Sequence, residues 1–326
     1  MNLEGHPMQL EGAIVATDDL MYQAVESDVK ILEDASRHIV TAGGKRVRPR
    51  MLFLCYLALG GTNLEQAVPI ATAVELVHTA TLVHDDINDH GRLRRGRVTV
   101  NEQWGRTFAL LTGDYLFTKV YSLMAPYGDL NKILAEATVA LVEGETLQAA
   151  AAKENNLNRE VYQKIVAKKT ASLFRAAALL GSNLANGSQR DVDALGDFGF
   201  YLGLTFQIVD DLLDLTGDSR LIGKDAGVDV EQGKGVATAY SHDHSNSNGN
   251  DHVQTIASIA ESPETEEGDP FLKIKRRLIE GGAVEEGKQM AQFLASQART
   301  SLQSIAPNEY VAQLENLVDQ ILSRTN

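Results

Sequence analysis

Two groups of aspartates share one spacing, and that spacing suits the binding of a divalent cation. The groups comprise six residues: Asp85, Asp86 and Asp89 in LVHDDINDH, and Asp210, Asp211 and Asp214 in FQIVDDLLDL. Residues four apart lie on one face of a helix, so the first and last carboxylates of each group are directed toward one place, where like charges repel. Magnesium relieves that repulsion, because it prefers carboxylate oxygens and keeps waters and substrate phosphates in its remaining positions. A single cluster is more often a solvated acidic face, but the repetition favours two facing helices that hold metal ions.

Basic residues gather in three short segments, two of which contain glycine. They are Lys45, Arg46 and Arg48 in GGKRVRP, Arg92, Arg94, Arg95 and Arg97 in RLRRGR, and Lys168 and Lys169 before Thr170 in KKT. Arginine binds phosphate oxygens with a rigid two-pronged group and lysine with a compact charge, while glycine lets the backbone approach an anion closely. Each segment alone could be an ordinary surface patch. Beside two acidic clusters, the three segments predict that a phosphorylated substrate is brought to the metal.

The composition limits the classes of function. The 326 residues carry a formal net charge of −14, which argues against general nucleic-acid binding because such binding depends on lysine and arginine. The one cysteine, Cys55, lies in an apolar run, which predicts a core position and excludes a disulfide framework. The first residues lack the pattern of a secretory signal, and no run of about 18 apolar residues predicts a transmembrane segment. We therefore expect a soluble, cytoplasmic protein.

The hydrophobic pattern predicts an all-α fold. Apolar residues recur three and four positions apart in segments such as GDYLFTKVYSLM and KILAEATVALVEGETLQAAAA, and sustained alternation of strand-forming residues is absent from the sequence. Clusters of Gly, Asn and Pro divide the chain into roughly ten helices. We expect one domain over residues 1–326, a single large helical bundle with a surface insertion at about 241–270. The histidines of that insertion, in SHDHSNSNGNDH, are more typical of a solvated loop than of a metal site.

Seven motifs, in order along the chain, resemble those of the trans-isoprenyl diphosphate synthases, also called polyprenyl synthetases. They cover most of the chain: GGKRVRP (43–49), ELVHTATLVHDDINDHGRLRRGRVT (75–99), GDYL (113–116), EGETLQ (143–148), KKTASLF (168–174), FQIVDDLLDLTGD (206–218) and GKDAGVDVEQGK (223–234). The resemblance implies a homodimer of helical subunits of the isoprenoid synthase type, each with a deep central cavity. It also implies the reaction, in which an allylic diphosphate is joined head to tail to isopentenyl diphosphate, giving an all-trans polyprenyl diphosphate. The cofactor implied is Mg²⁺, with about three ions per active site.

The same resemblance implies roles for individual residues. The metal ligands are the six aspartates of the two clusters, with direct contact implied for Asp85, Asp89 and Asp210. The implied contacts to the allylic diphosphate are Arg94, Lys169, Gln207, Lys224 and Lys234, with Thr170 near the developing cation. The implied isopentenyl diphosphate site comprises Lys45, Arg48, His78 and Arg95. The expected catalytic residues are Asp85, Asp89, Asp210, Lys169 and Arg94.

The residues before the first aspartate cluster bear on product length. In the family a bulky aromatic here stops chain growth early, whereas Ala80 and Thr81 are small and lie about one turn, roughly 5.4 Å, deeper than Asp85. The resemblance thus implies an open tunnel and products of C25 or longer, with Met124 as the next candidate for the floor. Tight helix packing is the other explanation of the small residues. A short-chain synthase that makes C15 or C20 products stays open as an alternative.

A second class of enzyme shares part of the pattern. The pair His84-Asp85, with His78 nearby, resembles the metal site of HD-type metal-dependent phosphohydrolases. Such a site needs further histidine ligands, and it leaves the second aspartate cluster unexplained. Prenyl transfer accounts for both clusters and is the favoured function.

Overall fold

The computed structural model describes residues 8–154, 156, 158–216 and 282–325. The expected surface insertion at about 241–270 lies outside the described residues, and so do the expected diphosphate contacts Lys224 and Lys234. In the described part nearly all regular structure is helical, which confirms the predicted all-α class.

Short connections join the helices of the N-terminal part. The elements are α1 (Leu10–Ala24), α2 (Lys30–Val40), α3 (Val47–Ala58), the 3₁₀ turn η1 (Leu64–Gln66), α4 (Val68–Asn88), α5 (Val100–Trp104), α6 (Arg106–Met124) and η2 (Ala125–Tyr127).

The elements that follow include the longest helices described. They are α7 (Leu130–Glu154), α8 (Arg159–Val166), the π-helical turn η3 (Ala167–Ala171), α9 (Ser172–Leu184), α10 (Gln189–Thr216), α16 (Ala283–Leu302), α17 (Glu309–Leu322) and η4 (Ser323–Thr325). Asparagine caps fix two of the starts, because Asn158 accepts from the N–H of Val161 on α8 and Asn308 accepts from that of Val311 on α17.

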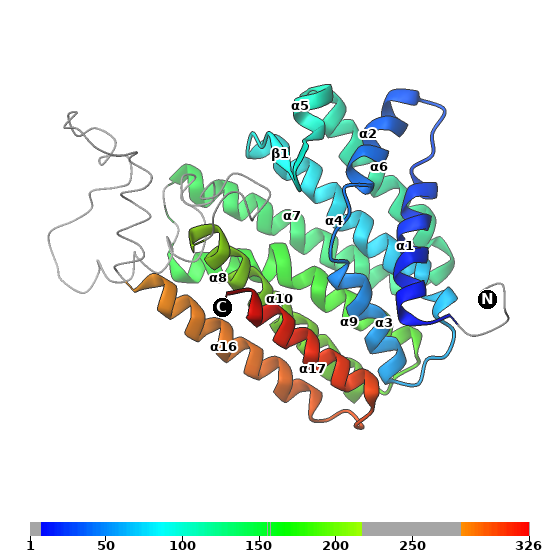
Figure 1. Cartoon of the computed structure of the whole chain (residues 1–326), viewed down its shortest axis with the longest axis vertical. Helices are drawn as coiled ribbons and strands as arrows, with labels where there is room; N and C mark the ends of the chain where they lie inside the picture. Colours follow the sequence, from blue (N-terminus) through cyan, green and yellow to red (C-terminus); the bar gives the residue numbers. More distant parts are fainter. Residues whose placement is uncertain (1–7, 155, 157, 217–281, 326) are drawn as a thin grey trace, which may run out of the picture.

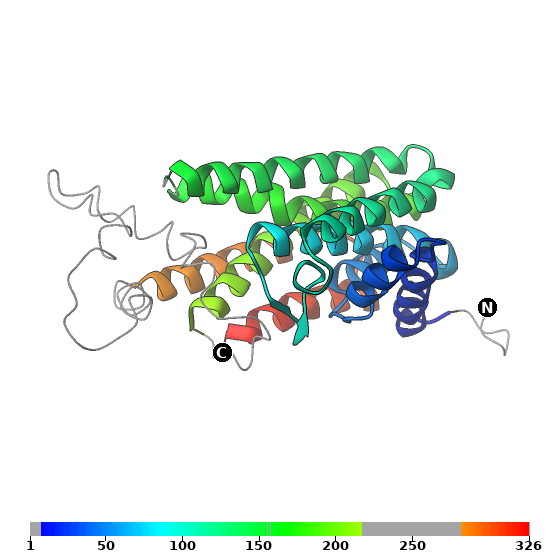
Figure 2. The ribbon, with the colours of Figure 1, turned by 90° about the horizontal axis from the view of Figure 1, so that it is seen from above.

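The two aspartate clusters lie on α4 and α10, whose buried residues run nearly their whole length. α4 packs along α6 and against α1 and α3, while α10 packs on α9 and α16. Figure 1 shows α9, α10, α16 and α17 running side by side, with α1 and α2 covering one end. In Figure 2 the green α7 lies on the opposite face from the orange α16 and the red α17.

One stretch, Leu64–Asn88, is long and apolar enough to cross a membrane by length and composition alone. Its most apolar window is 72% buried inside the structure, so the same apolar character is explained by packing against the helices around it. It is a core helix of the bundle, and its carboxyl end delivers the first aspartate cluster.

A small β-hairpin departs from the purely helical expectation. Strands β1 (Leu93–Arg94) and β2 (Arg97–Val98) pair antiparallel. Arg95 and Gly96 between them have φ values of 52° and 73°, the signs that a two-residue type I′ turn requires. The hairpin folds the basic segment RLRRGR back over the end of α4, which brings Arg94 to the first aspartate cluster.

Candidate active site

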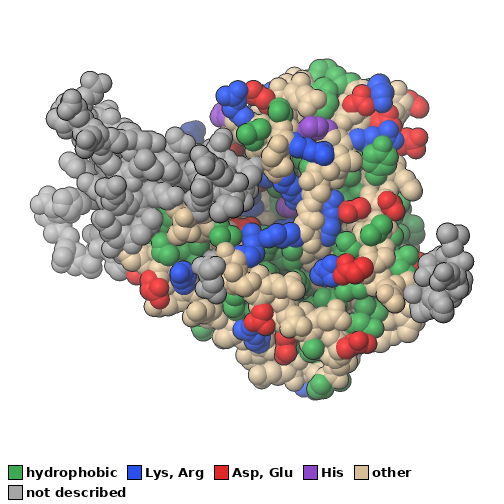
Figure 3. Space-filling model, viewed as in Figure 1, with side chains coloured by type: hydrophobic (Ala, Val, Ile, Leu, Met, Phe, Trp, Pro, Cys, Tyr) green, Lys and Arg blue, Asp and Glu red, His purple; other side chains and the backbone are tan. Residues whose placement is uncertain are grey.

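A pocket of about 240 Å³ lies where α4, α7, α8, η3 and α10 meet. Its lining includes polar residues from the motifs that were singled out in the sequence: Arg48, His78, Asp85, Asp89, Arg94, Gln148, Lys169, Thr170, Gln207, Asp210 and Asp211. Figure 3 shows Lys and Arg side chains gathered toward the middle of the face that is viewed there. The structure therefore brings together most of the site residues that the sequence predicted, in one pocket of mixed charge.

The first aspartate cluster divides its side chains between the pocket and the interior. Asp85 and Asp89 line the pocket, whereas Asp86 is 2% exposed and accepts a hydrogen bond of 2.7 Å from Nε of Arg94. Burial raises the pKa of the Asp85 carboxyl to about 6, against the attraction of Lys169. Burial also raises the pKa of Asp86, with Arg94 opposing it. Asp86 thus anchors the guanidinium of Arg94, which itself lines the pocket.

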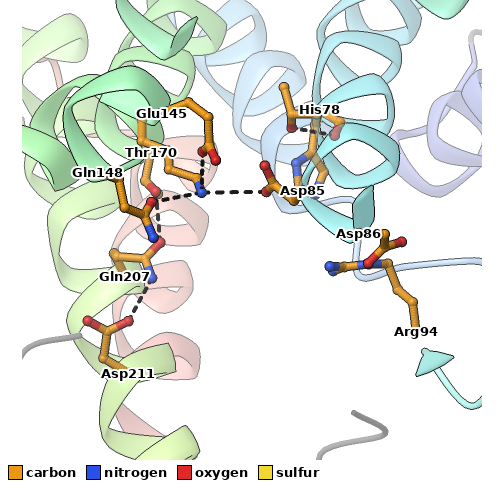
Figure 4. Close-up of polar contacts among 11 residues, drawn as sticks. His78, Asp85, Asp86, Arg94, Glu145, Gln148, Thr170, Gln207 and Asp211 are labelled. Carbon is orange, nitrogen blue, oxygen red and sulfur yellow. Dashed lines mark hydrogen bonds and ion pairs between the residues drawn. The ribbon is translucent and has the colours of Figure 1, made fainter. Parts of the chain in front are cut away.

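Lys169 connects the first cluster to α7. Its Nζ lies 2.5 Å from Oε2 of Glu145, 2.9 Å from Oε1 of Gln148 and 3.6 Å from Oδ2 of Asp85. Burial disfavours its charged form, but Asp85 and Glu145 together outweigh that effect and raise the pKa of Lys169. Figure 4 shows Glu145 and Gln148 meeting Asp85 across this ammonium group. Lys169 is therefore a cation held between carboxylates in the pocket wall.

Two local features place Lys169 there. It belongs to the π-helical turn η3, which rotates the side chains that follow relative to a regular helix. Gly144 permits the close approach of α7, since a Cβ at that position would lie 2.5 Å from the backbone nitrogen of Lys169. The motif EGETLQ therefore supplies a contact point at Gly144 and two partners of Lys169, Glu145 and Gln148. The motif is part of the family resemblance, but nothing in the sequence indicates that Glu145 and Gln148 contact Lys169.

The second cluster forms a polar chain with α8 and η3. Asp211 accepts from the hydroxyl of Tyr162 at 2.7 Å and from Nε2 of Gln207 at 2.7 Å. Oε1 of Gln207 in turn accepts from Oγ1 of Thr170 at 2.7 Å. Figure 4 shows Thr170, Gln207 and Asp211 in one line down this side of the pocket. Asp214 is 2% exposed and does not line the pocket.

Asp210 lines the pocket and forms an ion pair with a residue that sequence reasoning missed. Nη1 of Arg324, on η4, lies 2.7 Å from Oδ1 of Asp210. The guanidinium of Arg324 also lies over the ring of Phe206, 5.3 Å from its centroid. No local motif could have found Arg324, because more than a hundred positions of sequence separate it from Asp210.

The expected isopentenyl diphosphate residues do not all lie in the pocket. Arg48 and His78 line it; Lys45 and Arg95 do not. Burial lowers the pKa of Arg48 to about 10, and burial together with Arg48 lowers the pKa of His78 well below its ordinary value, which keeps that imidazole neutral. The pKa of Lys45 is lowered by burial and by Arg324, while Asp210 opposes the shift. Lys45 therefore interacts electrostatically with Asp210 of the second cluster, although it does not line the pocket.

Arg46 of GGKRVRP does not line the pocket, although its residue type suits phosphate. It is 5% exposed, and it pairs with Glu75 at 2.8 Å and with Asp18 at 2.6 Å. Because these two carboxylates already hold its guanidinium, Arg46 connects the start of α3 to α1 and α4 rather than facing the pocket. Its residue type suggested an anion site, but its position gives it a structural partner.

The two residues expected to set product length differ in position. Thr81 lines the pocket, and it also lines a second one of about 280 Å³ between α4, α6 and α7. Ala80 is fully buried and lines neither of these pockets. Leu141 is shared by the two pockets, and Met124 is buried in α6. The apolar part of the first pocket's lining includes Leu82, Ile165, Val166 and Leu173.

The acidic side chains of the pocket suit a metal ion that binds together with a substrate. Among the described residues no three His, Cys, Asp or Glu side chains converge as a protein-only metal site would require. Magnesium takes only one or two carboxylates per ion and completes its shell with water and phosphate, so Asp85, Asp89 and Asp210 on one pocket fit a metal that arrives with a phosphorylated substrate. Oδ2 of buried Asp86 makes no hydrogen bond within the described part, which leaves an acceptor beside them.

A phosphohydrolase site of the HD type is not assembled in the described residues. His84 does not turn toward the pocket beside Asp85: its Nε2 lies 3.3 Å from the carbonyl oxygen of Leu110 and 3.5 Å from Oδ1 of Asp114, both on α6. His78 lines the pocket without a second histidine beside it in that lining.

The chain is similar in sequence and in fold to polyprenyl synthetases. The family model described as polyprenyl synthetase matches residues 29–269. The chain is 35% identical over 236 residues to octaprenyl diphosphate synthase of Escherichia coli (strain K12), covering 72% of this chain and 73% of that protein. It is 38% identical over 206 residues to the short chain isoprenyl diphosphate synthase of Methanothermobacter thermautotrophicus, covering 61% of this chain and 63% of that protein.

A solved structure has the same fold. The polyprenyl synthase of Caulobacter crescentus, complexed with calcium and isoprenyl diphosphate, matches with a TM-score of 0.87 at 33% identity, covering 97% of this chain and 96% of that one. The similarity confirms the predicted isoprenoid synthase type of helical bundle. Relatives with long and with short products occur at similar identity.

Proposed function

The chain belongs to the polyprenyl synthetase family and is a prenyltransferase, and we propose that it condenses an allylic diphosphate with isopentenyl diphosphate, head to tail, with Mg²⁺ as the cofactor. The observation that carries this proposal is one pocket in which carboxylates of α4 and α10 meet Arg94 and Lys169, and whose lining also includes apolar residues such as Leu82, Ile165 and Leu173. Charged and apolar side chains in one pocket match the two ends of an allylic diphosphate.

The charged residues would bind and activate the allylic diphosphate. Asp85, Asp89 and Asp210 would hold the metal ions, and a bound Mg²⁺ supplies neutralisation of the leaving diphosphate. Lys169 and Arg94 lie among these carboxylates and would add positive charge where the diphosphate oxygens gain negative charge. Such fixed charges stabilise the separating ions more than the intact substrate, which lowers the barrier to breaking the C–O bond.

The polar chain on the opposite wall would flank the carbon that becomes cationic. Thr170 donates to Gln207, so the remaining lone pairs of both oxygens are available to a positive centre. Apolar residues of the lining, among them Ile165 and Val166, would exclude water that could trap the cation. Thr170 would thus help to orient the cation. The proposed reaction needs no side-chain base, because the released diphosphate can accept the proton.

The second substrate would bind through cations that lie beside the metal site. Arg48 lines the pocket with its guanidinium over the ring of Phe174, 4.4 Å from the centroid. Neutral His78 offers a hydrogen-bonding group without adding charge. Lys45 and Arg95 would complete this site by long-range attraction. Two diphosphate sites in one pocket would hold the double bond of isopentenyl diphosphate against the cation, which converts the condensation into a positioned reaction.

We propose products of C25 or longer. Support comes from the small side chain of Thr81, which lines both pockets, and from Ala80 beside it. A bulky residue at either position would divide the space below Asp85. Because relatives with long and with short products match at similar identity, a C15 or C20 synthase stays the alternative.

We also propose that the active form is a homodimer that pairs through α6 and α7. Leu110 of α6 is 47% exposed, Val142 of α7 is 54% exposed, and both line the second pocket, so they lie on one side of the molecule. Exposed aliphatic side chains that share one surface are typical of an interface, and a second copy would remove them from water.

One experiment tests the proposed function directly. The purified protein is incubated with Mg²⁺, labelled isopentenyl diphosphate and each of the C5, C10, C15 and C20 allylic primers, and the products are separated by chromatography. We expect label in prenyl diphosphates longer than the primer. Absence of elongated product with every primer would overturn the proposal.

A further inference from the structure

Tyr162 is a buried tyrosine in the wall of the active-site pocket. It lies on α8 and is 4% exposed, and it lines the pocket with its neighbours Ile165 and Val166. Its hydroxyl donates a 2.7 Å hydrogen bond to Oδ2 of Asp211. The acceptor belongs to the second aspartate cluster, so this bond joins α8 to α10 across one side of the pocket.

The bond is the end of a chain of three. Asp211 accepts from Tyr162 on one oxygen and from Gln207 on the other, at 2.7 Å each. Two donors on the two oxygens fix the plane of the carboxylate. With its Nε2 committed to Asp211, the amide of Gln207 must present Oε1 to Thr170, whose hydroxyl donates to it at 2.7 Å.

We propose that Tyr162 is a positioning residue for the allylic half of the active site. It fixes the plane of the Asp211 carboxylate, and that carboxylate, which can only accept, holds the Gln207 amide with its NH2 group toward Asp211 and its Oε1 toward Thr170. A hydroxyl that donates to a buried carboxylate makes a charge-assisted hydrogen bond, which is stronger and more directional than one between neutral groups. The inference rests on the proposed function, because it assigns Tyr162 to the half-site that binds the allylic substrate.

The position of α8 explains why this bond matters. α8 leads directly into η3, the π-helical turn that carries Lys169 and Thr170. Without the bond to Asp211, α8 keeps its apolar packing through Ile165 and Val166, so the helix stays in place while the polar chain loses its end. Tyr162→Phe therefore removes one hydroxyl and preserves the buried ring.

Tyr56 provides a matched control. It is 2% exposed, and its hydroxyl also makes hydrogen bonds, at 3.2 Å with the backbone N–H of Asn63 and at 2.5 Å with Nε2 of Gln66. It lies on α3 and does not line the pocket. Tyr56→Phe makes the same chemical change at similar burial, so it reports what the loss of a buried tyrosine hydroxyl does to the fold alone.

The test compares Tyr162→Phe, Tyr56→Phe and wild type in turnover, in thermal midpoint and in calorimetric affinity for farnesyl S-thiolodiphosphate with Mg²⁺. We expect Tyr162→Phe to lower kcat/KM for the allylic primer by about 10- to 100-fold, with the thiolodiphosphate bound more weakly. KM for isopentenyl diphosphate should change by less than about twofold, and Tyr56→Phe should leave all these quantities near wild type. Equal losses in the two variants, or wild-type behaviour of Tyr162→Phe, would overturn the inference.

A double-mutant cycle identifies the route of the effect. Thiolodiphosphate affinity is measured for Tyr162→Phe, Asp211→Asn and the combined variant, which needs no turnover. If Tyr162 acts through Asp211, its substitution adds little once Asp211 has changed; additive losses would place its action elsewhere. Elongation of a primer by the wild type separates the two proposals, because it upholds the proposed function whatever Tyr162→Phe does.

Discussion

Arg324 of η4 and Asp210 of α10 form an ion pair, with Nη1 2.7 Å from Oδ1. Arg324, far from Asp210 in the sequence, thus contacts a carboxylate that we assign to a metal ion. Arg324 and the metal compete for Asp210, since one carboxylate oxygen cannot be shared by both without strong repulsion between the cations.

Arg324→Gln is therefore expected to lower the Mg²⁺ concentration that gives half-maximal activity. A partly exposed ion pair contributes about 1 kcal/mol, so the shift should be about fivefold. The measurement is a Mg²⁺ titration of the rate, repeated for Mg²⁺-dependent calorimetric binding of farnesyl S-thiolodiphosphate. Arg299→Gln is the control, because Arg299 pairs with Asp319 on the outer helices α16 and α17. A raised Mg²⁺ requirement in Arg324→Gln would mean that Arg324 assists the diphosphate instead.

The fold was predictable to the extent that its helices are long and their apolar residues periodic. The hairpin of β1 and β2 was not predicted, because two residues per strand are too few for an alternating pattern to appear. Its turn could have been found from Arg95-Gly96, since glycine at the second turn position tolerates positive φ. The insertion at about 241–270 lies outside the described residues, so that expectation stays a prediction.

Within the site, residues in local motifs were predictable and residues joined only by the fold were not. Asp85 and Asp210 reach one pocket from motifs that spacing alone identified. Arg324 and Tyr162 belong to no such motif, and each contacts an aspartate that lies on another helix. Arg46 shows the opposite case, a residue whose type suits phosphate but which does not line the pocket. Its guanidinium is paired with the buried carboxylate of Glu75, and the sequence motif does not reveal that burial.

The metal proposal predicts a large loss when either cluster is broken. Asp85→Ala or Asp210→Ala should lower turnover by at least about a thousandfold, on the order of 4 kcal/mol of transition-state stabilisation. Asp197→Ala is the control, since Asp197 lies on α10 and is paired outside the pocket with Arg175. Steady-state rates with and without excess EDTA provide the measurement. Full activity in EDTA, or near-normal turnover in either pocket variant, would contradict the metal assignment.

The two diphosphate sites should separate kinetically. Lys45→Ala and His78→Ala should raise KM for isopentenyl diphosphate by about tenfold or more, while KM for the allylic primer changes by less than about twofold. Arg50→Ala is a matched control from the same segment, because Arg50 pairs with Glu11 of α1. Both KM values are measured with the other substrate saturating. Equal losses for both substrates would contradict the assignment of Lys45 and His78 to the isopentenyl diphosphate site.

The dimer proposal predicts that charge on α6 and α7 separates the subunits. Leu110→Glu combined with Val142→Glu places two carboxylates on the exposed apolar surface, and sedimentation velocity should then give a monomer where the wild type gives a dimer. Phe293→Glu on α16, where Phe293 is 56% exposed, should leave the dimer intact. A wild-type monomer, or a double variant that stays dimeric, would place the interface elsewhere or remove it.

Product length provides the last test, and the two candidate positions are expected to respond for different reasons. Thr81 lines both pockets, so the ring of Thr81→Phe would enter the space that a growing chain must use. The wild type should make products of C25 or longer, and this variant should shift them toward C15 or C20 while the first condensation continues. Thr81→Val is the control, since it keeps the size and removes the hydrogen bond from Thr81 to the carbonyl oxygen of His78.

Ala80 has no exposed surface, so Ala80→Phe must displace its neighbours to reach the same space. We expect the same direction of shift, accompanied by a loss of about 1–3 kcal/mol in the free energy of unfolding, because the core around Ala80 is already filled. Chromatography of labelled products and a thermal midpoint for each variant measure both effects. A wild-type product that ends at C15 or C20, or unchanged products in both variants, would move the floor to Leu141, which the two pockets share, or to Met124.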